Sequence, residues 1–228
     1  MPADARSLQT RDDVNYIAIE GVIGAGKTTL AQILANRIGG RVVSEELDAN
    51  PFLERFYSDR SRWAFQTQMS FLASRFKQQA ALIGTDLFHS VAVSDYTFDK
   101  DRIFARLNLS RDELALYETV FAMMKSSVPA PDVVVYLQCS TDRLMHNIRI
   151  RARSYEVNMD REYIDSLNRE YTDYFFRYTH GPLLIINVDK IDFVKNEAEL
   201  EEVVKQIVEY DHPATTYFNP TPVGTLFG

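Results

Sequence analysis

Cysteine is almost absent from this chain of 228 residues, since Cys139 is the only one. A single cysteine excludes an internal disulfide and a cysteine-rich zinc site, so we expect it to be a small buried residue. The histidines, at positions 89, 146, 180 and 212, lie far apart and lack the spacing of metal ligands. The sequence therefore gives no support for a zinc protein.

Long apolar runs and an excess of positive charge are also missing. No segment comes near the roughly eighteen apolar residues of a membrane span, and residues 1–13 lack the apolar stretch of a signal peptide. We therefore expect a cytoplasmic protein without a membrane partner. The net charge of -7 argues against a nucleic-acid partner, because duplex binding requires clustered cations. An anionic ligand would need a locally basic pocket.

The composition that remains, 46% hydrophobic and 25% charged, is that of a globular protein. Neither a repeat nor a flexible linker divides it, which predicts a single domain over residues 1–228, with an N-terminal arm at 1–14 and a C-terminal tail at 211–228. Short β-like segments alternate with helical ones. Strands are expected at residues 16–19, 41–43, 91–94, 133–137 and 183–188, and helices at 27–38, 62–83, 111–125, 142–153, 161–178 and 197–210. This alternation predicts a three-layer α/β/α fold around a five-stranded parallel sheet.

Residues 21–28 read Gly-Val-Ile-Gly-Ala-Gly-Lys-Thr and match the phosphate-loop pattern between a predicted strand and a predicted helix. Glycines let successive N–H groups turn toward phosphate oxygens at the N-terminus of a helix. Lys27 would give a mobile cation for the β- and γ-phosphates, and Thr28 a hydroxyl ligand for Mg²⁺. A glycine-rich turn without this role would not require Lys followed by Thr. The residues expected to contact ATP are Gly21, Gly24, Ala25, Gly26, Lys27, Thr28 and Thr29.

Two acids follow predicted strands. Glu45 comes after residues 41–43, and Asp95 comes directly after residues 91–94. Ligands of open parallel sheets bind beyond the carboxyl ends of the strands, so both side chains should project toward the phosphate loop. A kinase needs one carboxylate to accept the proton of the attacking hydroxyl and another to hold Mg²⁺ or its waters. The alternative is that either acid caps the next helix.

A cluster of arginines, Arg149, Arg151 and Arg153, concentrates positive charge near the end of the helix expected at 142–153. On a continuous helix Arg149 and Arg153 would share one face, and Arg151 would point elsewhere. The cluster would then surround a phosphate chain from more than one side, as a closing lid does. The alternative is a solvated basic helix end favoured by the helix dipole.

Together these motifs resemble the deoxyribonucleoside kinase family, from residue 16 to about residue 208. Residues 45–53, Glu-Glu-Leu-Asp-Ala-Asn-Pro-Phe-Leu, are similar to the family's Glu-Pro-Val followed by Asn-Pro-Phe-Leu, which puts Glu45 on the general base. The family's sugar-contacting tyrosine, its tryptophan and its base-reading glutamine and arginine are matched in order by Tyr57, Trp63, Gln68 and Arg75. Ordinary core packing by the apolar residues of the same helix is the alternative interpretation.

The lid of the family is matched by residues 143–158, where Glu156 would meet the sugar hydroxyl. Two positions depart from the family pattern. Tyr96 stands after Asp95 where many members have arginine, and Asn147 takes the place of the first lid arginine. Phosphate neutralisation would then rest on Lys27 and the remaining lid arginines, or on a further group. Which acid of residues 99–102 pairs with Arg75, if any, stays open.

The resemblance implies a P-loop kinase fold with a helical lid, working as a homodimer with ATP and Mg²⁺ on the 5′-hydroxyl of a deoxyribonucleoside. It implies catalytic roles for Glu45, Lys27, Asp95 and Arg151, ATP contacts by Arg149, Arg151 and Arg153, metal binding by Thr28 and Asp95, and substrate binding by Glu45, Tyr57, Trp63, Gln68, Arg75, Asp95 and Glu156.

The mixed donor and acceptor of Gln68 and the donors of Arg75 favour a purine, with deoxyadenosine first. Two alternative functions remain at this point. A nucleoside monophosphate kinase, such as a thymidylate kinase, would need extra cations for the acceptor phosphate. A non-catalytic nucleotide-binding switch would not need the residues that match the family's nucleoside site.

We expect Lys27→Ala to abolish phosphoryl transfer while the protein stays folded, because the backbone donors of the loop remain and only the mobile cation is lost. The measurement is turnover of ATP together with thermal unfolding. Wild-type turnover by the folded variant would contradict the assignment of the phosphate loop.

Overall fold

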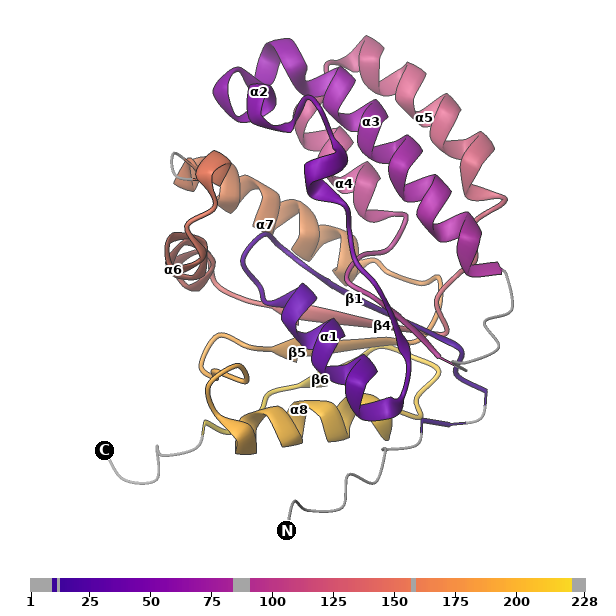
Figure 1. The fold of residues 1–228 in the computed structure, drawn as a ribbon, viewed down its shortest axis with the longest axis vertical. Coiled ribbons are helices and arrows are strands. Elements are labelled where there is room, and N and C mark those ends of the chain that lie inside the picture. The colour runs from indigo at the N-terminus through magenta and orange to yellow at the C-terminus, as the bar shows by residue number, and fades with distance from the viewer. Residues whose placement is uncertain (1–9, 12, 84–90, 157–158, 223–228) are drawn as a thin grey trace.

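The computed structural model describes residues 10–11, 13–83, 91–156 and 159–222. Six parallel strands form one sheet in the order β2-β3-β1-β4-β5-β6 (Figure 1). Along the chain they are β1 (Tyr16–Gly21), β2 (Arg41–Val43), β3 (Ala92–Ser94), β4 (Val133–Gln138), β5 (Leu183–Asn187) and β6 (Thr216–Phe218). The five strands expected from the sequence are all present. The sheet has one strand more than the five predicted, since β6 lies within the segment predicted to be a C-terminal tail.

Helices cover both faces of the sheet, which confirms the three layers (Figure 1). On one face α1 (Lys27–Ile38) lies beside α8 (Glu197–Val208), and Arg37 forms ion pairs with Glu197 and Glu201. The other helices are α2 (Leu53–Ser58), α3 (Arg60–Ala80), α4 (Lys100–Asn108), α5 (Arg111–Lys125), α6 (Thr141–Arg151) and α7 (Arg161–Phe176). Short 3-10 turns occupy Leu47–Ala49, Ala81–Ile83 and Ser154–Glu156. Among the described residues, no helix combines the length and the apolar character needed to cross a membrane.

Two helices, α2 and α4, were not predicted. The six residues of α2 are too few to show a helical period, and α4 opens on three charged residues that read as a loop. The helix at α5 begins as expected, because the Glu113 carboxylate accepts a hydrogen bond of 2.9 Å from the backbone N–H of Ser110. The helix at α6 ends earlier than expected, at Arg151, because Ala152 adopts the left-handed conformation with φ of 49°.

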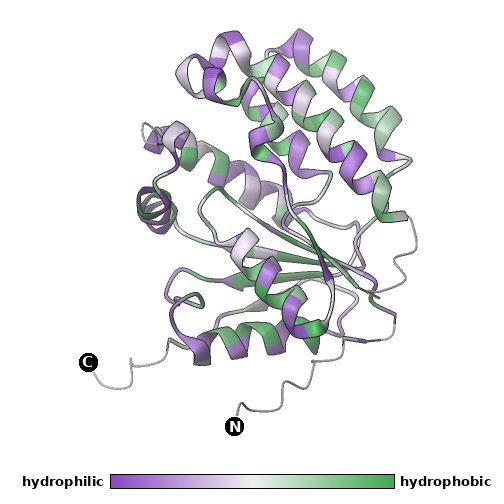
Figure 2. Ribbon diagram, in the orientation of Figure 1, coloured by the Kyte–Doolittle hydropathy of each residue, from purple (hydrophilic) through white to green (hydrophobic). Residues whose placement is uncertain are grey.

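The apolar core lies between the sheet and its two helical layers. The central strands that contribute to it are largely hydrophobic (Figure 2). The side chains of β1 are buried along the whole strand, and those of β4 are buried up to Leu137. Tyr136 of β4 stacks on Phe175 of α7 with ring centroids 4.3 Å apart. Cys139 is buried, as the sequence predicted. The strands thus form a rigid floor that fixes where their carboxyl ends lie.

The register of the sheet brings three strand ends together. Ser94 of β3 pairs with Ala18 of β1 and with Val43 of β2. The residues that follow, among them Glu45 and Asp95, therefore leave the sheet at the same edge as the loop that follows β1. The candidate site is built on this edge.

Candidate functional site

The loop between β1 and α1 has the glycine conformations that its sequence predicts. Gly24 and Gly26 have φ values of 90° and 93°, in the left-handed region that residues with a side chain rarely adopt. Space is also limited, since a Cβ on Gly24 would lie 2.9 Å from the carbonyl oxygen of Leu144 in α6. A Cβ on Gly26 would lie 2.8 Å from the ring of Phe193. The glycines thus serve both the turn of the loop and its close packing.

Lys27 and Thr28 open the helix that follows this loop. The ammonium group of Lys27 donates a hydrogen bond of 3.0 Å to the carbonyl oxygen of Val22. Burial, reinforced by the nearby positive charge of Lys100, lowers the pKa of Lys27 to about 8. The hydroxyl of Thr28 donates to a carboxylate oxygen of Asp95. An incoming phosphate would therefore meet a lysine whose charge is poorly compensated.

Asp95 connects the phosphate loop to the end of β2. One of its carboxylate oxygens accepts from Thr28, and the other accepts a hydrogen bond of 2.8 Å from the backbone N–H of Glu45. The alternative interpretation, that either acid caps the next helix, does not hold, because the turn at Leu47–Ala49 is preceded by Glu46 and α4 is preceded by Asp99. The carboxylate of Asp95 beside a hydroxyl is a donor set of the kind that Mg²⁺ prefers.

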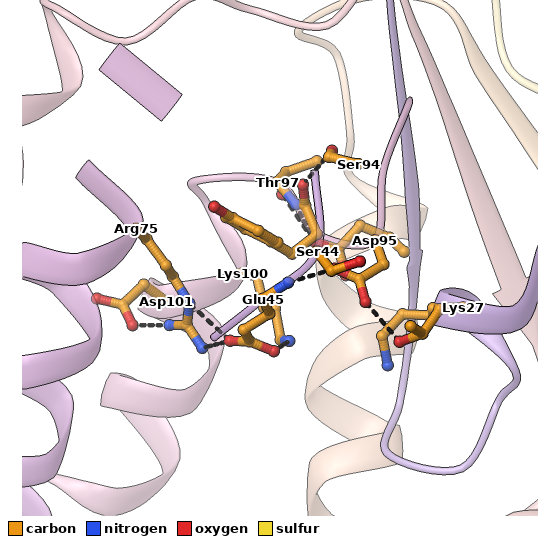
Figure 3. A network of polar contacts seen from close by, with 12 residues as sticks. Lys27, Ser44, Glu45, Arg75, Ser94, Asp95, Thr97, Lys100 and Asp101 are labelled. Carbon is orange, nitrogen blue, oxygen red and sulfur yellow. Dashed lines mark hydrogen bonds and ion pairs between the residues drawn. The ribbon is translucent and has the colours of Figure 1, made fainter. Parts of the chain in front are cut away.

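Glu45 is the centre of a buried ion network (Figure 3). Its side chain is only 9% exposed and accepts hydrogen bonds from the guanidinium of Arg75 and from the ammonium of Lys100. Burial would raise the pKa of Glu45, but the charges of Lys100 and Arg75 outweigh it and hold this pKa well below its usual range. Glu45 is therefore ionised at any physiological pH.

Among the acids of residues 99–102, Asp101 is the one that pairs with Arg75, in addition to Glu45, which answers the question that the sequence left open. The neighbouring acid, Asp99, instead binds Lys125 of α5. Asp101 also accepts a hydrogen bond of 2.7 Å from the hydroxyl of Tyr117. The ion pair between Arg75 and Asp101 thus joins helices α3 and α4 next to Glu45.

Sequence reasoning missed Glu20, the residue before the phosphate loop. Its buried carboxylate accepts hydrogen bonds from the backbone N–H of Thr97 at 2.6 Å and from the hydroxyl of Thr97 at 2.8 Å. Burial raises the pKa of Glu20, and Lys100 opposes this rise. The rule that singled out Glu45 and Asp95, an acid at the carboxyl end of a strand, applies equally to Glu20 and would have found it.

Two cavities meet at the phosphate loop. The first, the acceptor cavity, is bounded by α2, α3, α4 and the lid, and the second, the donor cavity, lies between the loop, α6 and residues 188–195. Both are lined by Lys27, Thr28, Arg151 and Arg153. A group held by these four side chains can be approached from both cavities.

The acceptor cavity contains most of the residues expected to bind substrate. Gln68 and Arg75 line it from α3, Tyr57 from α2, and Glu156 from the turn after α6. The side-chain oxygen of Gln68 is buried and has no hydrogen-bond partner within the described residues. A buried acceptor of this kind indicates a missing donor. Trp63 is different: it stacks on Phe52 at 5.9 Å and is not part of the described lining of either cavity.

Arg149 and Arg153 do not share a helix face, although a continuous helix would have placed them on one. Because α6 ends at Arg151, Arg153 lies beyond the helix, and both side chains turn toward Glu156. Arg149 is exposed, and its Nε donates a hydrogen bond of 3.2 Å to the carbonyl oxygen of Met145 one turn earlier. Of these three arginines, Arg151 and Arg153 line the two cavities, whereas Arg149 is not in the described lining of either.

Residues that line the donor cavity are joined by contacts that the sequence did not reveal. The side-chain amide of Asn147 donates a hydrogen bond of 2.8 Å to the carbonyl oxygen of Gly24. Arg143, on the same helix, donates to the carbonyl oxygen of Ile191 at 3.1 Å. Both contacts join α6 to segments far away in the sequence, so no local pattern could have indicated them.

The sequence profile of the deoxynucleoside kinases matches residues 17–210. This chain belongs to the deoxynucleoside kinase family. It is 32% identical to a deoxyguanosine kinase of Bacillus subtilis over 85% of this chain and 96% of the relative. It is 31% identical to a deoxyadenosine/deoxycytidine kinase of the same organism over 87% of this chain and 94% of the relative. A deoxyadenosine kinase from M. mycoides with dCMP and dCDP bound shares the fold, with a TM-score of 0.72 at 24% identity over 84% of this chain and 96% of that one.

This family membership makes the chain an enzyme of the P-loop kinase fold, a deoxynucleoside kinase. The resemblance that carried the sequence analysis is thereby confirmed.

The depressed pKa of Lys27 predicts how the binding of ATP changes with pH. Well below pH 8 the side chain of Lys27 in the free enzyme is protonated and can bind phosphate directly. Above about pH 8 it is mostly neutral, so Lys27 must take up a proton when ATP binds. We therefore expect the dissociation constant for ATP to be constant between about pH 6.5 and 7.5 and to rise about tenfold per unit well above pH 8. Titration calorimetry measures it, and Lys27→Ala should lose this dependence. A wild-type affinity that stays flat up to pH 9.5 would contradict the assignment.

Proposed function

We propose that this deoxynucleoside kinase transfers the γ-phosphoryl group of ATP to the 5′-hydroxyl of a purine deoxyribonucleoside, with deoxyadenosine preferred, and releases the 5′-monophosphate. The observation that carries the proposal is the pair of cavities that share Lys27, Thr28, Arg151 and Arg153, with Glu45 in the acceptor cavity. Relatives described as deoxyguanosine kinase and as deoxyadenosine kinase support the purine class. A homodimer and a cytoplasmic location stay predictions.

On the donor side, the phosphate chain of ATP would lie along the loop from Gly21 to Thr29. The ammonium group of Lys27 would leave Val22 for the β- and γ-phosphates, and Arg151 and Arg153 would close over them with the rest of the lid, residues 143–158. Thr28 and Asp95 would hold Mg²⁺, which neutralises phosphate charge when bound.

On the acceptor side, Glu45 would bind the 5′-hydroxyl and take its proton. The hydroxyl oxygen forms a bond to the γ-phosphorus while the bond from that phosphorus to the bridging oxygen breaks, and ADP leaves. The paired cations make Glu45 a weak base. In a loose transition state this is no obstacle, because orienting the hydroxyl in line with the leaving oxygen contributes more than basic strength.

The base would be read by Gln68 and Arg75. The unpaired oxygen of Gln68 accepts a hydrogen bond, and the amino group of the same amide donates one, which fits the amino group and a ring nitrogen of adenine. Arg75 is anchored by Glu45 and Asp101 and still lines the acceptor cavity, so its remaining N–H groups are available to ring nitrogens. Tyr57, stacked on Tyr155 at 5.7 Å, and Glu156 would hold the sugar.

The central test pairs two neighbouring glutamates. We expect Glu45→Gln to bind deoxyadenosine normally and to lose about a hundredfold or more in turnover, because the amide keeps the shape but cannot accept the proton. Its matched control is Glu46→Gln, at the exposed adjacent position, which should keep wild-type turnover. Steady-state assays with ATP and a panel of deoxynucleosides give the result. An active Glu45→Gln beside an inactive Asp95→Asn would mean that the two acids have exchanged roles.

Base selection is tested on α3. We expect Gln68→Leu to lower kcat/KM for deoxyadenosine about tenfold or more, because the amino group of the base then meets no acceptor. Gln66→Leu, at an exposed position of the same helix, is the control and should leave kcat/KM unchanged. If the wild-type enzyme already prefers thymidine, or if Gln68→Leu keeps its preference for deoxyadenosine, the purine proposal is wrong.

A further inference from the structure

A cation is missing at the position after Asp95. The family pattern to which the sequence was compared has arginine there, whereas this chain has Tyr96. The side chain of Tyr96 is fully buried, and its hydroxyl donates a hydrogen bond of 2.6 Å to the side-chain oxygen of Gln78 in α3. Tyr96 is therefore committed to packing and brings no charge to the acceptor cavity.

A cation from another element occupies that cavity. Lys100, the first residue of α4, is only 5% exposed, and its ammonium group binds the carboxylate of Glu45 (Figure 3). A lysine is unfavourable at this position for two reasons. Burial removes the hydration of its ammonium group, and the N-terminus of a helix already carries partial positive charge. Its neighbours Asp99 and Asp101 turn to Lys125 and Arg75 instead. Of these three consecutive residues, Lys100 is the one that lines the acceptor cavity.

The position of Lys100 fits phosphate as well as carboxylate. It lines the same cavity as Lys27, Thr28 and Arg151, the residues around the expected γ-phosphate. Two ammonium groups that line one cavity favour the binding of an anion in it.

We propose that Lys100 is a catalytic residue that contacts the transferred phosphoryl group and replaces the arginine absent at position 96. This inference rests on the proposed function. Before transfer, the charge of Lys100 is matched by ionised Glu45. When Glu45 takes the proton of the 5′-hydroxyl, it becomes neutral, and the phosphoryl group bonded to the 5′-oxygen becomes the nearest anion. Lys100 then exchanges a carboxylate partner for a phosphate partner, and no buried charge is left unpaired at any stage.

A positioning role makes a different prediction from a catalytic one. If Lys100 only held Glu45 in place, its loss in a Glu45→Gln background would affect the nucleoside and the 5′-monophosphate equally, because no carboxylate would be left unpaired and neither ligand would contact Lys100. Direct contact with the phosphoryl group instead weakens the 5′-monophosphate selectively.

The experiment measures the binding of deoxyadenosine and of its 5′-monophosphate by calorimetry, together with turnover with ATP. In Lys100→Met we expect the affinity for the monophosphate to fall roughly tenfold or more, the affinity for deoxyadenosine to change by less than about threefold, and kcat to fall. Lys100→Arg keeps the cation and should recover part of both losses. Lys125→Met is the matched control, since Lys125 binds Asp99 outside the acceptor cavity, and it should behave as wild type.

A second comparison is used if the Lys100→Met variant does not fold because Glu45 has lost one of its two cation partners. Glu45→Gln removes the carboxylate, and the double variant Glu45→Gln/Lys100→Met removes the ammonium group as well, so neither variant contains an unpaired carboxylate at position 45. The double variant should bind the monophosphate about tenfold more weakly than Glu45→Gln does. Equal losses for both ligands, or an unchanged ratio between them, would overturn the role of Lys100 alone. A wild-type enzyme that neither binds nor phosphorylates deoxyadenosine or any other deoxynucleoside would overturn the proposed function, and this inference with it.

Discussion

Glu45 carries a charge inside the protein, and a buried carboxylate is tolerated only when it is paired. Its partners come from two different helices, Arg75 from α3 and Lys100 from α4, and Asp101 completes the network. These ion pairs join both helices to the end of β2, alongside the apolar cluster that α3, α4 and α5 share. Because α3 and α4 also line the acceptor cavity, the pairing of one carboxylate contributes to the shape of that cavity.

Asp95 extends this constraint to the donor side. It joins Thr28 of the phosphate loop to the backbone of Glu45, so the residues for the two substrates are held at a fixed separation through one side chain. The floor beneath them is the parallel sheet, whose register brings the ends of β1, β2 and β3 to one edge. In-line transfer depends on such alignment, since misplacement of the reacting atoms by a fraction of an ångström lowers the rate of reaction.

The arginines of the lid are more exposed than the cations around Glu45. Arg151 and Arg153 are both paired with Glu156 and are about one-third exposed, in contrast with the buried pairs around Glu45. Partly exposed ion pairs contribute little to stability and exchange partners readily. The two arginines thus place partly exposed positive charge at the phosphate loop, whereas their partner Glu156 is buried and Glu45 is held by buried cations.

The sequence by itself determined the features that depend on near neighbours: the phosphate loop, the core strands, the capping box at Ser110, and the face of α3 that carries Gln68 and Arg75. Tertiary structure alone decided the rest. The partners Glu45 and Lys100 are 55 residues apart, and nothing local to either indicates the other. Strand β6 forms because the edge of β5 is available to pair with it. Helix α6 ends at Arg151 because Ala152 adopts a left-handed conformation, although it is not a glycine. Periodicity and motifs record interactions within a few residues, whereas charge pairing and edge pairing depend on which distant segments the fold brings together.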